Sequence, residues 1–196
     1  MNLIRGFFSE IDARWKPIGA VPIRLRIIGS AALMLQTDYE RGTRDGDILE
    51  AEEITPPVRG QLLALAGPKS ALCGKYRMCV ELVMPAILFL PRAPIFHPVP
   101  RMPLKNFSAE VLDVMDVVVS KLKRLNQNDA DDIRAMAERK LLNHKKLVRS
   151  FESAMDGFST DARADDFPKY IENLHRIERD LFGVPESRID LPDWMR

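Results

Sequence analysis

Apolar side chains in the first part of the chain recur with two different periods, and each period predicts a different element. Between residues 2 and 15 the spacing is three or four residues and Pro17 ends the run, which predicts a helix packed on a core. A membrane-surface helix would need a basic polar face, whereas this segment mixes acids with bases. Residues 21–28 alternate, which predicts a strand, and the mostly apolar residues 31–36 predict a short buried helix.

The same two patterns continue up to a proline-rich stretch. Residues 45–50 are expected to form a second strand, and the alternation over residues 76–83 predicts a third. Between them, residues 61–66 are expected to be helical, because two prolines precede them and proline is favoured in a first helical turn. Residues 85–103 contain six prolines, so no regular structure is expected there.

Beyond Pro103 the pattern becomes that of amphipathic helices. Four are predicted, at residues 108–125 with Ser108 as the cap, 129–139, 143–157, and 165–182 with Gly183 as the stop. The pattern therefore predicts an α+β protein. Residues 1–103 are expected to form an α/β domain in which helices flank a mixed sheet, and residues 104–196 a helical bundle that shares a cleft with it.

Composition excludes several classes of protein. The 196 residues are 46% hydrophobic and 29% charged, as in ordinary globular proteins, and the net charge of +1 gives no global attraction to nucleic acid or membrane. Proline interrupts the longest apolar run, and acids interrupt any signal-peptide pattern at the N-terminus. Cys73 and Cys79 lack the spacing and the histidines of a zinc site. A reduced, cytoplasmic setting is expected.

Residues 27–47 carry the candidate chemistry. The predicted strand ends at Gly29, which permits a tight turn, and Ser30 lies at or near the start of the next helix. Free amides and the positive end of a helix dipole suit a phosphate group. Asp45 and Asp47 are two residues apart on the next predicted strand, so both carboxylates face one side and repel each other unless a cation lies between them. A phosphate cradle beside a carboxylate pair is what phosphoryl transfer requires.

At these residues the chain resembles a known superfamily. Gly29-Ser30, then fourteen residues, then Asp45-x-Asp47 is similar to the signature of the DNA polymerase β-type nucleotidyltransferases, and most similar to the bacterial AbiEii-like toxin group. Members of that group often read Gly-Gly-Ser-Ala before an apolar run, then Arg-x-Thr-x-Asp-hydrophobic-Asp. Here Ile28 replaces the first glycine, and Gly46 replaces the hydrophobic residue between the aspartates.

The resemblance assigns further residues, and each assignment has an alternative. Glu81 occupies the place of the family's third carboxylate, or else it is a solvent-facing residue of an edge strand. Arg41 and Arg44 steady a bound triphosphate, or else they balance the two aspartates.

In the second half, Lys121 of a Lys-Leu-x-Arg stretch is implied to face phosphate, with Asp131 or Asp132 as an auxiliary acid or as the lysine's partner. Alternatively, the lysine lies along a helix edge and the aspartates complement a helix dipole.

The resemblance implies a Mg²⁺-dependent nucleotidyltransferase of the bacterial cytoplasm. Asp45, Asp47 and Glu81 would be the catalytic and metal-binding residues, and Gly29, Ser30, Arg44 and Lys121 would bind the phosphates of an NTP. The acceptor hydroxyl would belong to tRNA or another RNA, a protein or a small molecule. A toxin role would add a cognate antitoxin as partner, and no membrane is implied. The alternative is a catalytically silent protein of the same fold that binds or regulates a partner.

Overall fold

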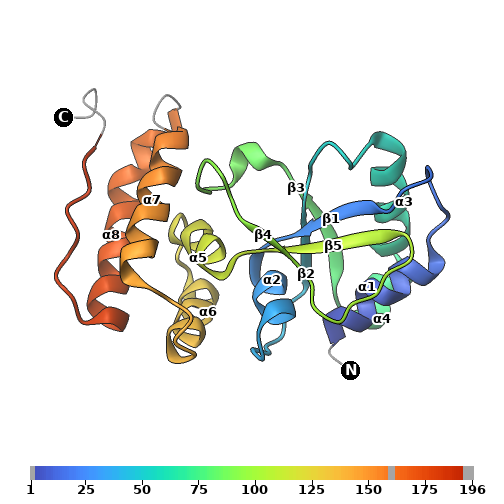
Figure 1. The fold of residues 1–196 in the computed structure, drawn as a ribbon, viewed down its shortest axis with the longest axis horizontal. Helices are drawn as coiled ribbons and strands as arrows, with labels where there is room; N and C mark the ends of the chain where they lie inside the picture. The colour runs from blue at the N-terminus through green and yellow to red at the C-terminus, as the bar shows by residue number, and fades with distance from the viewer. Residues whose placement is uncertain (1–2, 159–161, 192–196) are drawn as a thin grey trace. The chain divides into compact units, whose positions relative to one another are not determined.

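The computed structural model describes residues 3–158 and 162–191 (Figure 1). Within this part the chain forms two compact units. The first comprises the residues up to Leu88 together with Phe96–Leu112, and the second comprises Phe89–Ile95 and the described residues from Asp113 onward. The chain thus leaves the first unit, returns to it, and leaves it again.

The first unit is built on a five-stranded mixed sheet with the order β3-β2-β1-β5-β4. Neighbouring strands β1 and β2 are antiparallel, as are β4 and β5, whereas β1 with β5 and β2 with β3 are parallel. This mixed sheet with its surrounding helices confirms the predicted α+β fold class, and a mixed sheet with flanking helices is what the resemblance implied. The strands are β1 (Ile23–Ile27), β2 (Asp45–Leu49), β3 (Cys79–Val83), β4 (Phe96–Pro98) and β5 (Phe107–Leu112).

The helices of the first unit follow the apolar spacing closely. Helix α1 buries Ile4, Phe7, Phe8 and Ile11, which are spaced as the apolar face of a helix requires. Helix α3 begins with a proline pair, as expected, and α4 is an additional short helix that the sequence pattern did not predict. These helices are α1 (Leu3–Arg14), α2 (Gly29–Gln36), α3 (Pro56–Ala66) and α4 (Ala71–Tyr76), with a 3-10 turn at Pro85–Ile87.

Two segments that were not predicted to be strands are part of the sheet. Residues 107–112 form β5 rather than the start of a helix, and every one of the five residues of β1 has a partner on it. The helix begins later, where the Asp113 side chain accepts a hydrogen bond from the main chain of Met115. In the proline-rich segment, β4 pairs with β5 at the edge of the sheet, the position in which a strand tolerates proline. The third strand is also shorter than predicted, because Tyr76 ends α4.

The second unit is helical, as predicted for this part of the chain. Its elements are α5 (Val114–Leu122), α6 (Gln127–Glu138), α7 (His144–Phe158), a 3-10 helix (Ala162–Asp166), α8 (Phe167–Ile177) and a π-helical turn (Glu178–Phe182). Gly183 follows that turn with a φ of 61°, the left-handed conformation expected of a stop signal. Phe89 from the proline-rich segment enters the core of this unit and contacts Phe151 and Tyr170.

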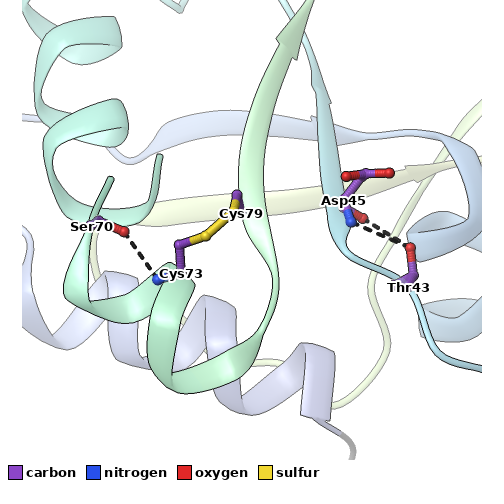
Figure 2. Close-up of a disulfide and its surroundings, with 5 residues drawn as sticks. All are labelled: Thr43, Asp45, Ser70, Cys73 and Cys79. Atoms are coloured by element: carbon purple, nitrogen blue, oxygen red, sulfur yellow. Dashed lines mark hydrogen bonds between the residues drawn. A yellow bond between two sulfur atoms is a disulfide. The ribbon is translucent and has the colours of Figure 1, made fainter. Parts of the chain in front are cut away.

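Cys73 and Cys79 are joined in a disulfide, contrary to the reduced state expected from the sequence (Figure 2). The turn after α4 brings their Cα atoms to 4.7 Å, a separation that a disulfide can span. The Ser70 side chain caps α4 by accepting a hydrogen bond from the Cys73 main chain, at 3.0 Å. In the described part of the chain, no helix has both the length and the apolar character needed to cross a membrane.

Candidate functional site

Gly29 joins β1 to α2 in a conformation that no other residue would adopt without strain. Its φ is 63°, and a Cβ atom there would stand 2.5 Å from Oδ2 of Asp47. The main chain on either side is held in place, because the Ile28 amide donates a hydrogen bond of 2.9 Å to the Asp47 carbonyl. Glycine is therefore required both for the turn and for the close approach of a carboxylate.

The first turn of α2 lies at the same point. Ile28 occupies the N-cap position, and its side chain provides no capping oxygen. Ser30 is the second residue of the helix and is buried, and no acidic residue lies in the first turn. Since Ile28 cannot cap the helix, the arrangement suits an external anion at its amides.

Asp45 and Asp47 occupy alternate positions of β2. The intervening Gly46 and the following Ile48 are buried, whereas Asp45 is exposed and Asp47 half-buried. The two carboxylates therefore belong to the face of the sheet opposite the one that Gly46 presents to α1. The Thr43 hydroxyl donates to the Asp45 carbonyl and accepts from the Asp45 amide, each at 3.4 Å. Figure 2 draws both hydrogen bonds.

Gly46 has a packing explanation. A Cβ atom on this residue would meet Cε1 of Phe7 at 3.4 Å and Cζ of Phe8 at 3.7 Å. The aromatic rings of α1 thus fill the space that a hydrophobic side chain at this position would need. The departure from the family pattern lies on the helix side of the sheet and leaves the positions of the two carboxylates unaffected.

Glu81 lies beside Asp47 in the parallel pair of β2 and β3. Partners in register on neighbouring strands point to the same face, so Glu81 shares a face with the aspartates. It is also exposed, and β3 is an edge strand. Features of both interpretations are therefore present. Across the residues that the structure describes, no three His, Cys, Asp or Glu side chains lie close enough together to hold a metal ion.

Of the two arginines in the loop before β2, Arg41 is the one that reaches the helix. Its Nη2 donates a hydrogen bond of 2.6 Å to Oγ of Ser30, and its Nη1 donates to the Gly42 carbonyl at 2.8 Å. Arg44 is exposed, and its main-chain carbonyl accepts a hydrogen bond from Cys79. The site residues assigned from the resemblance included Arg44 and not Arg41 among the phosphate ligands. Only the folded loop shows that Arg41 lies at the first turn of α2.

Lys121 lies in the second unit, in a buried cluster of charges. Its Nζ lies 3.0 Å from Asp129 and 2.8 Å from Asp132, and all three side chains are less than a tenth exposed. Burial alone would raise the pKa of Asp129, but a hydrogen bond from Arg124 and the charge of Lys121 hold that pKa below its ordinary value.

The other acids of this region divide between two roles. Asp132 is a partner of the lysine, one of the roles considered for it, whereas Asp131 is on the surface and binds Gln127 and Arg134. Sequence reasoning missed Asp129, although the spacing Asn126-x-x-Asp129 was available as a signal. This pair forms a capping box at the start of α6.

Comparison with models of protein families finds a match over most of the chain. A family model described as nucleotidyltransferase of unknown function (DUF6036) covers residues 10–178, which include Gly29-Ser30, both aspartates and the Lys121 region. No curated protein and no solved structure matches the chain significantly. The closer relation to the AbiEii-like group stays a prediction.

Proposed function

The chain belongs to this family of nucleotidyltransferases, and from that premise we propose that it transfers a nucleoside monophosphate from an NTP to an acceptor hydroxyl. The observation that carries the proposal is the Asp47 carboxylate lying against Gly29 at the first turn of α2. There, a carboxylate able to bind a cation lies beside main-chain amides able to bind phosphate. Positioning and charge neutralisation of this kind supply most of the catalysis in phosphoryl transfer.

The carboxylate pair on β2 has the donor chemistry that Mg²⁺ prefers. This ion prefers oxygen ligands and is commonly held by one or two carboxylates, while substrate phosphates and water complete its shell. Asp45 and Asp47 would supply the two carboxylates. Glu81, on the neighbouring strand, forms no close group of three acids with them in the described structure, so it would complete a metal site only by moving toward them on binding, or else serve as a base. When bound, Mg²⁺ would neutralise the charge that develops as the phosphates separate.

The remaining residues would bind phosphate and accept a proton. Ser30 and the amides after Gly29 would hold the terminal phosphates, and Arg41 would add a cation at the same turn. The acceptor oxygen would bond to the α-phosphorus while the bond to the bridging oxygen breaks and pyrophosphate leaves. If Glu81 does not hold metal, it would take the acceptor's proton as general base.

The family pattern assigns two more cations to the phosphates, Arg44 and Lys121. Arg44 is exposed in the same loop as Arg41 and is open to solvent. Lys121 shares its charge with Asp129 and Asp132, so a phosphate would have to compete with two carboxylates for it. Because Arg41 and Ser30 lie together at the first turn of α2, we give them the main role in binding the triphosphate.

The finer version of the proposal is an AbiEii-like toxin of the bacterial cytoplasm, with a cognate antitoxin and with tRNA or another RNA as acceptor. Its test is induced expression followed by growth measurement and mass analysis of RNA and protein. Growth arrest together with a nucleotide-sized mass added to an RNA or protein would support it. Normal growth with no modified product would reject the toxin version and leave a housekeeping transferase or a catalytically silent protein.

The deciding experiment is thermal unfolding of wild type and of Asp47→Asn, with and without Mg²⁺ plus ATP, GTP, CTP or UTP. If Asp45 and Asp47 form a metal-binding site, the wild-type protein should unfold at a higher temperature when Mg²⁺ and nucleotide are present. Asp47→Asn then gains nothing, and it is at least as stable as wild type in metal-free buffer because a like-charge repulsion is removed. Glu52→Gln, an exposed acid in the same unit, is the matched control and should respond like wild type. A wild type indifferent to metal and nucleotide, beside an Asn variant that melts earlier, would show an ordinary structural pair.

One observation favours a second candidate, a catalytically silent protein of this fold. Glu81 is exposed on an edge strand, and no acidic group of three within the described residues is arranged to hold a metal. A silent protein would still bind a partner, and it could bind an NTP without turning it over. Pyrophosphate release measured beside nucleotide binding separates the two candidates.

A further inference from the structure

Outside the candidate site, a group of exposed basic side chains lies in the segment that connects α6 to α7 and in the first turns of α7. Residues 139–149 contain five Lys and Arg residues and no Asp or Glu, in a chain whose 29 basic and 28 acidic residues nearly balance. Four of the five side chains are exposed: Lys140, Lys145, Lys146 and Arg149. We call these four the α6–α7 basic surface. The fifth, Arg139, turns back and donates to the Ala135 carbonyl at 3.1 Å.

The geometry of α7 places these charges on one side. Its buried residues are Leu147, Phe151, Ala154, Met155 and Phe158, which form the stripe that packs into the core of the second unit. Lys145 and Arg149 are four residues apart and Lys146 and Arg149 three apart, so they are neighbours on the opposite, solvent-facing side. Lys140 lies just before the helix, in the turn that Asn143 ends by accepting a hydrogen bond from the Lys146 amide.

The positions of these charges are unfavourable for the fold itself. Like charges at a four-residue spacing repel each other, and cations in the first turn of a helix oppose its dipole. The nearest acids along the chain, Glu138 and Glu152, are exposed and form no ion pair with the surface. In the described chain, none of the four basic side chains forms an ion pair. Elsewhere in the same unit Arg179 pairs with two glutamates.

We propose that the α6–α7 basic surface binds the sugar-phosphate backbone of a nucleic acid. A row of adjacent, solvated cations fits a polymer that carries one negative charge at each repeat, and it gains affinity by releasing that polymer's counterions. The cations are on a helix face and in a turn, from which long side chains reach phosphates without reading sequence. Binding itself does not depend on the proposed function. The role of the bound nucleic acid does, because it would supply the acceptor hydroxyl for nucleotidyl transfer.

The test is fluorescence anisotropy with a labelled hairpin RNA, its single-stranded form and a DNA hairpin of the same sequence, in the absence of Mg²⁺ and NTP. With about four phosphate contacts, raising the salt from about 50 to about 200 mM would weaken binding roughly fifty-fold for the single strand and roughly 150-fold for the hairpins. The triple variant Lys145→Gln, Lys146→Gln and Arg149→Gln should weaken binding roughly fifty-fold at physiological salt and lower the salt slope by about two to three. RNA bound more tightly than DNA would identify RNA as the partner, and equal binding would identify the shared backbone.

The matched control removes three charges elsewhere. The control is a triple variant with Lys16→Gln, Lys69→Gln and Lys169→Gln. These three lysines are exposed and distributed over both units, so the control variant should bind nucleic acid as wild type does. Equal loss in both triple variants would reduce the effect to net charge and overturn the proposal. The proposal would also be overturned if binding did not change with salt concentration, if neither nucleic acid bound, or if only an acidic protein bound. Unfolding temperatures of both variants show whether each is folded. Since no nucleotide is present, failure here is independent of failure to bind NTP.

Discussion

The carboxylate of Asp47 lies against the main chain of Gly29, so close that a single added carbon on the glycine would stand 2.5 Å from its Oδ2. Gly29 is the first residue of α2 and Asp47 lies in β2, so the turn at Gly29 and the placement of the carboxylate depend on each other. A substitution at the glycine is therefore expected to act on the aspartate as well as on the turn.

Gly29→Ala should cost stability in two ways. The left-handed φ of 63° strains any side chain by about 1–3 kcal/mol, and the overlap with Asp47 adds to this. Gly183→Ala is the matched control, because its φ is 61° and no described atom lies within 4 Å of the Cβ position. Denaturant unfolding should show the larger loss for Gly29→Ala, and only that variant should lose stabilisation by Mg²⁺ and NTP. Equal losses of stability and equal stabilisation by Mg²⁺ and NTP in the two variants would show that Gly29 has no role in the site.

Gly46 should tolerate one carbon and reject a branched side chain. Alanine would make ordinary contacts with Phe7, whereas valine would overfill the space at a cost of about 1–3 kcal/mol. Phe7→Ala opens that space, so the double variant with Gly46→Val should lose less stability than the two single losses added together. Denaturant unfolding of the four proteins measures the coupling. Strict additivity would show that the Phe7 ring does not decide the residue at position 46.

Arg41 should matter more than Arg44 for nucleotide affinity. Arg41→Gln removes the charged donor to Ser30 at the first turn of α2, a loss of about 1.5–3 kcal/mol or roughly ten- to a hundredfold in NTP affinity. Arg44→Gln removes the same charge from the same loop and serves as the matched variant. Calorimetric titration with an NTP and Mg²⁺ compares them. A greater loss with Arg44→Gln would restore the assignment made from sequence.

Lys121→Met should destabilise the second unit by about 3–5 kcal/mol, because it leaves the buried carboxylates of Asp129 and Asp132 without their shared cation. Adding Asp132→Asn to this variant should recover part of the loss. Lys123→Met is a control at a neighbouring half-buried lysine. Unfolding in metal-free buffer is the measurement. If Lys121→Met kept its full stability and lost only NTP affinity, the lysine would serve phosphate rather than the fold.

Acid should weaken the segment after α8 through Glu178. Burial opposes the charge of this carboxylate, yet hydrogen bonds from Ser187 and His144 hold its pKa below the ordinary value of 4.5. Since the folded pKa is lowered, this stabilisation is complete above about pH 4.5 and is lost as the pH falls through the folded pKa. Glu178→Gln should therefore be less stable than wild type at neutral pH, and the difference should shrink on acidification. Glu152→Gln, an exposed acid, should show no such difference.

The sequence by itself determined whatever depends on near neighbours along the chain. The period of two places Asp45 and Asp47 on one face of β2, and the glycine after β1 predicts the turn that φ confirms. Helices α1 and α8 follow from apolar spacing, and the glycine at position 183 predicts where the last helical segment ends.

Tertiary structure alone decided what depends on partners distant in sequence. Residues 107–112 have a helix-compatible composition, yet they become β5 because β1 offers a parallel partner along its whole length. Gly46 is explained only by the rings of α1, and Arg41 is singled out only once its loop folds back to Ser30. Lys121 meets its carboxylates only when α5 packs on α6. Local periodicity records which face a residue occupies, whereas the neighbour it meets there is fixed by the packing of the whole unit.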